Sequence, residues 1–184
     1  MRIIIDGVDK SGKSTLIEAL KNKIPNAIMV KLLSKPKDKE TGPTYIKTMY
    51  AKMAELTRDV NTNFVFDRWY PSEMVYSFKR GYDALEDGWF YKMENELRKT
   101  DGFYILVEAD PALVAKRFKT AKEDFAKVEE IEKLQERYRE HYKNCQLHKI
   151  KVDTTNSLDA VVQQILDAIE EIKKPKTIDF SEEK

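Results

Sequence analysis

The amino-acid sequence predicts an α/β fold, a P-loop three-layer α/β/α arrangement around a five-stranded parallel sheet. Short apolar runs rich in branched side chains alternate with stretches of helical spacing along the chain. The first run leads directly into a glycine-rich motif that precedes a helix. The 184 residues show no repeat and no low-complexity linker, which suits one compact core.

Five apolar runs are the predicted strands. They lie at residues 2–6, 27–33, 63–67, 103–107 and 149–153. Strands that alternate with helices form parallel sheets, and such sheets bind ligands at the carboxyl ends of their strands. We therefore expect the chemistry just after residues 6, 33, 67, 108 and 153.

Helices are expected between these strands. Apolar spacing predicts one that ends near Pro25, and a second over 46–56 that begins at Thr41 or Thr44. A polar loop at 34–43 precedes the second helix. Later helices are indicated by proline at a first turn, by glycine beyond a last turn and by a capping serine. They are expected from Pro71 to near Gly81, from Asp87 to Lys99, from Asp110-Pro111, from Glu123 to Tyr142, and after Ser157.

Composition argues against several classes of protein. The net charge is +1, and 41% of residues are hydrophobic, which gives no overall field toward nucleic acid or anionic membranes. No apolar run has the length of a membrane span, and the N-terminus does not resemble a signal peptide. The single cysteine, Cys145, fits a reducing compartment and is expected to be a spectator on a polar helix. A cytoplasmic protein is predicted.

The segment from Gly7 to Ser14 matches the motif G-x-x-x-x-G-K-[ST] in full. Its curled backbone and the following helix N-terminus present N–H groups to phosphate oxygens. We expect Lys13 to reach the β- and γ-phosphates, and Ser14 to offer its hydroxyl to Mg²⁺. Thr15 is expected at the α-phosphate. ATPases, GTPases and kinases share this motif, so it indicates a nucleotide rather than a reaction.

Two charged residues inside the motif narrow the choice. A carboxylate at Asp9 is repelled by a triphosphate, so it is expected to face a second ligand that has a hydroxyl to donate. Lys10 places a mobile positive charge beside the transferred group. A solvated Asp–Lys pair at the loop tip is the simpler alternative.

A second motif, Asp67-Arg68-Trp69-Tyr70-Pro71-Ser72, follows the third strand. Asp67 is positioned to hold Mg²⁺, directly or through water. Arg68 is positioned to bridge a donor γ-phosphate and an acceptor phosphate, because a guanidinium offers a rigid fork of donors.

At these residues the sequence resembles the thymidylate kinases of the nucleoside monophosphate kinase group. The phosphate loop 7–15 with its aspartate and the stretch 67–76 carry the resemblance. The segment 110–117 looks like the helix before the family's lid, and 152–157 is similar to the loop around the donor adenine. The likeness covers nearly the whole chain in order.

The resemblance implies roles for individual residues. Asp9 would bind the acceptor's 3′-hydroxyl, Lys10 would stabilise the transferred group, and Arg68 would hold the acceptor phosphate. Arg117 would lie near the donor base or the lid hinge. The implied ATP-binding set is Gly7, Ser11, Gly12, Lys13, Ser14, Thr15 and Arg117, and the acceptor set is Asp9, Lys35, Tyr45, Arg68, Tyr70, Ser72 and Tyr76.

The sequence also departs from the family. Where the family has Arg-Glu-Pro after its second strand, this chain has Ser34-Lys35-Pro36, so Lys35 would substitute as a point charge. The helix after Pro43 offers Tyr45 and Tyr50 but no arginine before Arg58 to contact thymine. These differences from the family concern the base of the acceptor nucleotide more than the type of reaction.

Charged residues elsewhere receive two different interpretations. A lid at about 116–126 is expected to bring Lys116, Arg117, Lys119 and Lys122 toward phosphate. Charges at 129–139 are interpreted as a solvated helix face with i,i+4 pairs. His141 and His148 have no partners at metal-ligand spacing.

The predicted organisation is one kinase domain at 1–174 with a polar tail at 175–184. The predicted reaction is ATP- and Mg²⁺-dependent phosphorylation of a deoxynucleoside monophosphate, with dTMP as the leading acceptor. A deoxynucleoside kinase and a P-loop nucleotide switch or NTPase stay open as alternatives. The expected partners are nucleotide substrates, with neither nucleic acid nor membrane, and the resemblance alone suggests a homodimer.

Overall fold

A computed structural model describes residues 1–31, 40–80, 87–119 and 127–174. Lys35, most of the expected lid and the polar tail lie outside these ranges. Within them, no helix is long and apolar enough to cross a membrane.

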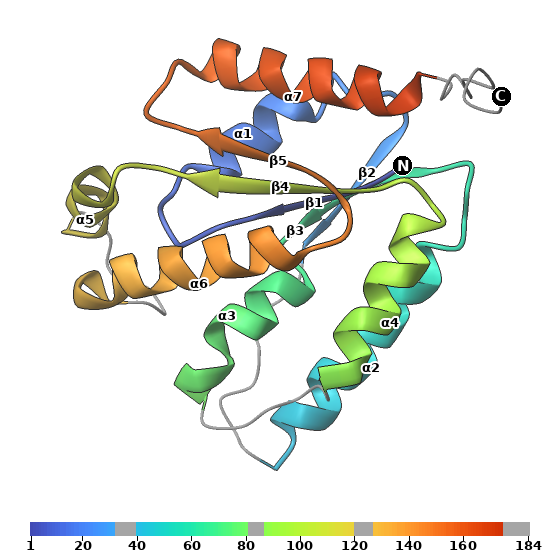
Figure 1. Cartoon of the computed structure of the whole chain (residues 1–184), viewed down its shortest axis with the longest axis horizontal. Coiled ribbons are helices and arrows are strands. Elements are labelled where there is room, and N and C mark those ends of the chain that lie inside the picture. The colour runs from blue at the N-terminus through green and yellow to red at the C-terminus, as the bar shows by residue number, and fades with distance from the viewer. Residues whose placement is uncertain (32–39, 81–86, 120–126, 175–184) are drawn as a thin grey trace, which may run out of the picture.

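The five predicted strands form one fully parallel sheet, which confirms the α/β prediction (Figure 1). Their order in the sheet is β2-β3-β1-β4-β5, so the strand that leads into the phosphate loop is central. The strands are β1 Arg2–Asp6, β2 Ala27–Lys31, β3 Asn63–Asp67, β4 Gly102–Glu108 and β5 His148–Asp153. Because Ile5 is in register with Asp67, the loops after β1 and β3 leave the sheet side by side.

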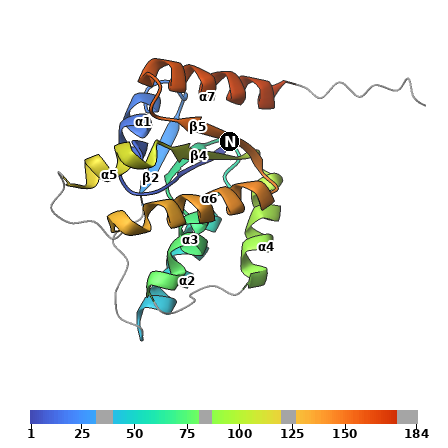
Figure 2. The same cartoon turned by 60° about the vertical axis from the view of Figure 1, so that its left-hand side comes forward.

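Helices cover both faces of the sheet (Figures 1 and 2). They are α1 Lys13–Leu20, α2 Gly42–Leu56, α3 Tyr70–Arg80, α4 Asp87–Arg98, α5 Pro111–Lys119, α6 Ile131–Asn144 and α7 Leu158–Lys173, with a 3₁₀ turn at Val128–Glu130. Two caps match the prediction: Asp110 accepts from the N–H groups of Ala112 and Leu113, and the Ser157 hydroxyl accepts from Ala160 N. Both depend on residues adjacent in sequence, which is why the sequence predicts them.

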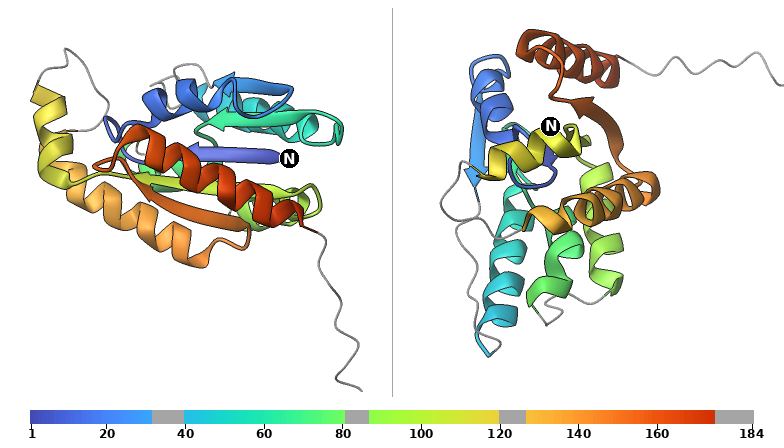
Figure 3. Two further views of the ribbon diagram at one scale, coloured as in Figure 1. Left: turned by 90° about the horizontal axis from the view of Figure 1, so that it is seen from above. Right: turned by 90° about the vertical axis from the view of Figure 1, so that its left-hand side faces the viewer.

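Alternating side chains of β1 divide the core in two. Ile3 and Ile5 pack with α1 and α7, whereas Ile4 packs with α2, α3, α4 and α6. Figure 3 shows α1 and α7 on one side of the sheet and the larger helical layer on the other. All of β1 is buried, as expected of a central strand with both faces covered.

Three boundary or surface predictions are wrong. Gly42 and Pro43 form the first turn of α2 instead of a loop, because proline fits a helix's first turn. In the described part of the stretch 123–142, the helix proper begins only at Ile131. Cys145 is buried beyond the end of α6, because the chain turns inward there toward β5.

The charges at 129–139 agree in part with the predicted solvated face, since Glu132, Lys133 and Glu136 are exposed. Glu130 is paired with Lys79 of α3, and Arg139 lies 2.6 Å from a carboxylate oxygen of Glu108. The Arg137 guanidinium donates to the Met74 carbonyl at 2.9 Å. Alternation of charge predicts pairs within a helix, whereas Glu130 and Arg139 pair with residues of α3 and β4.

Candidate functional site

The loop between β1 and α1 is held open by glycines in conformations that other residues rarely adopt. Gly12 has φ +97°, and Gly7 has φ +150°. A Cβ atom on Gly7 would lie 2.2 Å from the Val107 carbonyl oxygen, so no side chain fits there. Lys10 also takes a left-handed φ of 61°. The loop therefore curls tightly around the end of β1, as a phosphate-binding loop requires.

Lys13 is buried at the start of α1 and directs its ammonium back into the loop. Its Nζ donates to the carbonyl of Gly7 at 2.9 Å and to the carbonyl of Val8. Burial, with a contribution from the nearby Arg68 charge, lowers the pKa of Lys13 to about 7. Two or more phosphate charges beside Nζ would reverse this shift.

Oxygen donors suited to phosphate and Mg²⁺ chemistry gather around this loop. Ser14 and Thr15 expose their side chains on the first turn of α1. The Ser11 hydroxyl is buried, and it has no hydrogen-bond partner among the described residues. Mg²⁺ prefers hydroxyl, carboxylate and phosphate oxygens, so the Ser14 hydroxyl and a nearby carboxylate fit that ion.

Asp67, at the end of β3, is the carboxylate predicted for the metal. Its side chain is 16% exposed and lies 3.4 Å from the Lys31 ammonium of β2. Lys31 is itself largely exposed, so this pair is open to exchange with another cation.

Two residues from distant segments contact the loop. The Thr154 hydroxyl, after β5, donates to the Ser11 carbonyl at 2.6 Å, and its methyl side packs where Gly12 has no Cβ. Arg117 of α5 donates to the Lys10 carbonyl at 3.0 Å. The structure thus brings Arg117 to the tip of the phosphate loop.

Arg68 follows β3 in a left-handed backbone conformation, with φ +67°. Its N–H donates to the Ile5 carbonyl at 3.0 Å, which fixes this backbone against β1. The guanidinium then turns toward the phosphate loop, where its Nη2 lies 2.5 Å from Oδ1 of Asp9. A strained backbone held in this way is typical of a functional position.

Asp6 is the centre of the hydrogen bonds around Arg68. The carboxylate is fully buried and accepts from Gly7 N at 2.8 Å and from Ser72 N at 2.9 Å. It also accepts from the hydroxyls of Ser72 and Tyr138, at 2.7 and 2.8 Å, and lies 3.5 Å from Nη1 of Arg68. A buried carboxylate that accepts from this many donors is fixed in place.

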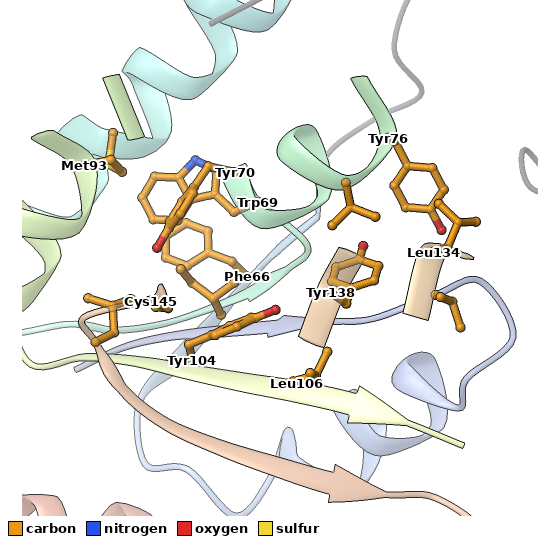
Figure 4. Close-up of a cluster of buried hydrophobic side chains, with 14 of the residues drawn as sticks. Phe66, Trp69, Tyr70, Tyr76, Met93, Tyr104, Leu106, Leu134, Tyr138 and Cys145 are labelled. Carbon is orange, nitrogen blue, oxygen red and sulfur yellow. The ribbon is translucent and has the colours of Figure 1, made fainter. Parts of the chain in front are cut away.

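Two tyrosines complete the surroundings of the guanidinium. Tyr138 of α6 accepts from Arg68 Nη1 at 3.0 Å, and burial is the main reason that its pKa is raised well above the ordinary value. Tyr76 of α3 places its ring 5.4 Å beneath the Arg68 guanidinium and donates to Asp9 at 3.4 Å. Tyr76 and Tyr138 lie together in Figure 4.

The remaining predicted acceptor residues are less close to this centre. Ser72 is buried against Asp6, and Tyr45 is half-buried on α2. Tyr70 has no exposed surface, and its hydroxyl donates to Glu94 at 3.0 Å. The position of Tyr70 therefore does not suit the wall of a pocket, because the first turn of α3 points it into the core.

Sequence reasoning missed Asp6 and Tyr138, and it included Thr154 only within the segment 152–157 expected around the donor adenine. One feature of the sequence could have identified Asp6 as a site residue: it is a carboxylate that ends an apolar strand directly before the phosphate loop. Thr154 follows a predicted strand end, which indicates the right edge of the sheet but not its contact. Tyr138 carried no signal, since it is 70 residues from Arg68 and sits in a charged helix.

No protein-family model matches the chain. Among curated proteins it is 24% identical over 200 residues to the thymidylate kinase of Schizosaccharomyces pombe, covering 96% of this chain and 95% of that protein. It is 27% identical over 206 residues to the Plasmodium falciparum thymidylate kinase, covering 97% and 94%. It is also 25% identical to YorR, an uncharacterised SPbeta prophage-derived protein of Bacillus subtilis, over 91% and 98%.

Solved structures show the same fold. The crystal structure of YorR in complex with phosphorylated GDP superposes with a TM-score of 0.74 at 24% identity, over 92% of this chain and 96% of that chain. A deoxyadenosine kinase from M. mycoides with bound dATP gives a TM-score of 0.61 at 18% identity, over 92% and 100%. The Candida albicans thymidylate kinase gives 0.59 at 17%, over 92% and 91%.

These comparisons confirm two statements made from the motifs. The resemblance to thymidylate kinases extends over nearly the full chain. The fold is the P-loop α/β fold of nucleoside monophosphate and deoxynucleoside kinases. The homologues support a nucleotide kinase as the class of activity.

Proposed function

We propose that this chain transfers the γ-phosphoryl group of ATP to the phosphate of a deoxynucleoside monophosphate, with dTMP as the leading acceptor. The observation that carries the proposal is the Asp9–Arg68 ion pair at the tip of the phosphate loop. A loop that only binds a triphosphate has no need of a carboxylate at its tip. An acceptor with both a hydroxyl and a phosphate needs both members of this pair.

Arg68 suits the space between two phosphates. Its guanidinium is fixed by Asp6, Tyr138 and Ser72 on one edge, while its other edge meets Asp9. The acceptor phosphate would compete with Asp9 for the guanidinium N–H groups of Arg68. The γ-phosphate of ATP would approach along the phosphate loop. Fixed donors of this kind stabilise charge as it moves between the two phosphates.

Asp9 would accept a hydrogen bond from the acceptor's 3′-hydroxyl once Arg68 turns to the acceptor phosphate. Tyr76 stands beside both residues, at hydrogen-bond distance of Asp9 and under the Arg68 plane. Ser72 acts through Arg68 and Asp6, because it is buried between them. Lys35 and Tyr45 are proposed to complete the acceptor side.

The donor side would use the phosphate loop. Lys13 exchanges its two carbonyl partners for the β- and γ-phosphates, and Lys10 lies at the tip beside the transferred group. Gly7, Ser11, Gly12 and Thr15 line the phosphates, with Arg117 reaching the same tip through the Lys10 carbonyl. Ser14 and Asp67 would hold Mg²⁺, which would neutralise charge on the phosphates.

A deoxynucleoside kinase is the second candidate, favoured by the likeness to deoxyadenosine kinase at a TM-score of 0.61. That reaction needs a free carboxylate to take a proton from the acceptor hydroxyl. Asp9 is engaged by Arg68, and Asp6 is fully buried. Neither is a base with open access, so the monophosphate is the better acceptor. Because the YorR structure contains phosphorylated GDP, purine monophosphates are also among the acceptors to be tested.

The test is ADP release with Mg²⁺-ATP against a panel of nucleosides and their monophosphates. The proposal expects turnover with one or more deoxynucleoside monophosphates, led by dTMP, and background rates with every nucleoside. Turnover with nucleosides alone would establish the second candidate. Acceptor-independent ADP release would indicate an NTPase or a nucleotide switch instead.

Three further expectations belong to this proposal. The chain acts as one domain over 1–174, with a lid at about 116–126 and a location in the cytoplasm. A homodimer through helices is the expected assembly, and Tyr91 of α4, 73% exposed, is available for such a contact. Sedimentation of the full chain tests the assembly.

A further inference from the structure

A second group of ionisable side chains lies inside the larger helical layer, away from the phosphate loop. It consists of Glu94 of α4, His141 of α6 and Cys145 just beyond α6. One ligand atom of each lies within 4.8 Å of the others. All three residues are buried, with exposures of 7, 8 and 3%. The sequence predicts no partner for His141 and a place on a polar helix for Cys145; both predictions are wrong, because the end of α6 and the residues just after it lie against Glu94.

The hydrogen bonds of this cluster leave one ring nitrogen without a partner. Nε2 of His141 is buried, and it has no hydrogen-bond partner among the described residues. The Cys145 sulfur and a Glu94 carboxylate oxygen lie within 4.8 Å of each other. A buried polar atom without a partner is destabilising, so its presence calls for an explanation.

The Glu94 carboxylate is oriented from outside the cluster. Tyr70 donates to Oε1 at 3.0 Å, and the backbone N–H of Gln146 donates to Oε2 at 3.1 Å. Figure 4 shows Tyr70 turned toward Cys145 across the core. Partners that fix a ligating carboxylate in this manner are typical of metal sites in proteins.

We propose that Glu94, His141 and Cys145 bind one Zn²⁺ ion. Thiolate, imidazole and carboxylate are the ligands that zinc takes in proteins, and three of them leave a fourth tetrahedral position for water. The thiol loses its proton to solvent when the sulfur–zinc bond forms. The two negative ligands then neutralise the ion, which suits a buried position.

Such an ion would tie α4 to the end of α6 and to the connection into β5. It is separate from the Mg²⁺ proposed at Ser14 and Asp67, because a thiolate and an imidazole favour zinc whereas those oxygens favour magnesium. Its effect is therefore on the stability of the helical layer rather than on phosphoryl transfer.

The test is metal titration of the full chain, freed of metal by a chelator and kept reduced, in the absence of nucleotide. Calorimetry with Zn²⁺ is expected to give one site per chain, and Zn²⁺ should raise the melting temperature. Co²⁺ should produce a thiolate-to-cobalt charge-transfer absorption. Oxygen ligands at the phosphate loop cannot give that band, so it reports this cluster alone.

Two variants and one matched control decide the result. Cys145→Ser should abolish the cobalt band, and Glu94→Gln should retain the band with Zn²⁺ affinity lowered by roughly a hundredfold or more, since losing even an outer-shell partner costs about 10–100-fold. His148→Ala removes the chain's other histidine, which is exposed on β5, and should change nothing. A folded wild type without the band, or equal Zn²⁺ affinity in Cys145→Ser, would overturn the proposal.

Discussion

The phosphate loop and the surroundings of Arg68 lie side by side but are built in different ways. The loop consists of consecutive residues from Gly7 to Thr15, and its shape follows from two glycines and one helix start. Arg68 is held by residues from β1, the loop, α3 and α6. Local chemistry therefore determines the first region, whereas the whole fold determines the second.

The largest effect is expected where the loop concentrates its charge. Lys13→Ala should lower turnover by roughly 10²–10³-fold or more, as the loss of one donor to a developing charge commonly does. The variant should fold, because the loop's shape rests on its glycines and on Thr154. The check is steady-state kinetics together with circular dichroism.

Proton uptake on nucleotide binding is the control for the Lys13→Ala prediction. With its pKa lowered to about 7, Lys13 is mostly neutral at pH 8, and bound phosphates should restore its charge. Calorimetry of nucleotide binding in two buffers should show about one more proton taken up by the wild type than by Lys13→Ala. At pH 6, where Lys13 already carries its proton, the difference should vanish. Full turnover in a folded Lys13→Ala would refute the role of the loop.

Arg68 tests the second region directly. Arg68→Ala should lower kcat by about a hundredfold, because charge-assisted contacts to both phosphates strengthen in the transition state. Arg68→Lys keeps the charge without the fork and should recover only a small part of the loss. A change confined to the Michaelis constants would mean that Arg68 serves binding alone.

Asp9 links the two regions, and its effect should depend on the acceptor. Asp9→Asn should lower kcat/KM for a normal acceptor by about ten- to a hundredfold, which is the range for a hydrogen bond to a charged group. A 3′-deoxy acceptor should be poor with the wild type and little worse with the variant. Equal losses on both acceptors would show that Asp9 does not contact the 3′-hydroxyl.

Tyr138 should give the smallest change. Tyr138→Phe removes one hydroxyl that holds both Asp6 and Arg68, so kcat should fall about three- to tenfold while the nucleotide Michaelis constants stay near the wild type. Tyr142→Phe, on the same helix and half-buried, is the matched control and should keep full activity. Equal effects of the two substitutions would mean that Tyr138 contributes only through packing.

The same contrast explains how much the sequence predicts. Strand order along the chain, the loop and the Ser157 cap depend on neighbouring residues, and each prediction agrees with the structure. Tyr138 joins Arg68 across 70 residues, and no periodicity in a charged helix reports such a contact. Tyr70 illustrates the converse: a motif position suggested a pocket wall, but the helix start turned it into the core.

The predictions for His141 and Cys145 are wrong for the same physical reason. They lie four residues apart, but two candidate ligands alone do not indicate a metal site, and only the fold brings Glu94 of α4 to them. A cluster whose third member comes from a distant segment leaves no complete local pattern, so it becomes visible only in the folded chain.

The most direct test of the central claim is to follow the phosphoryl group itself. The full chain is incubated with Mg²⁺ and ATP labelled on its γ-phosphate, together with either dTMP or thymidine, and the products are separated. We expect label in dTDP, with an equal amount of ADP, and no labelled product from thymidine. Label transferred to thymidine, or released only as inorganic phosphate, would contradict it.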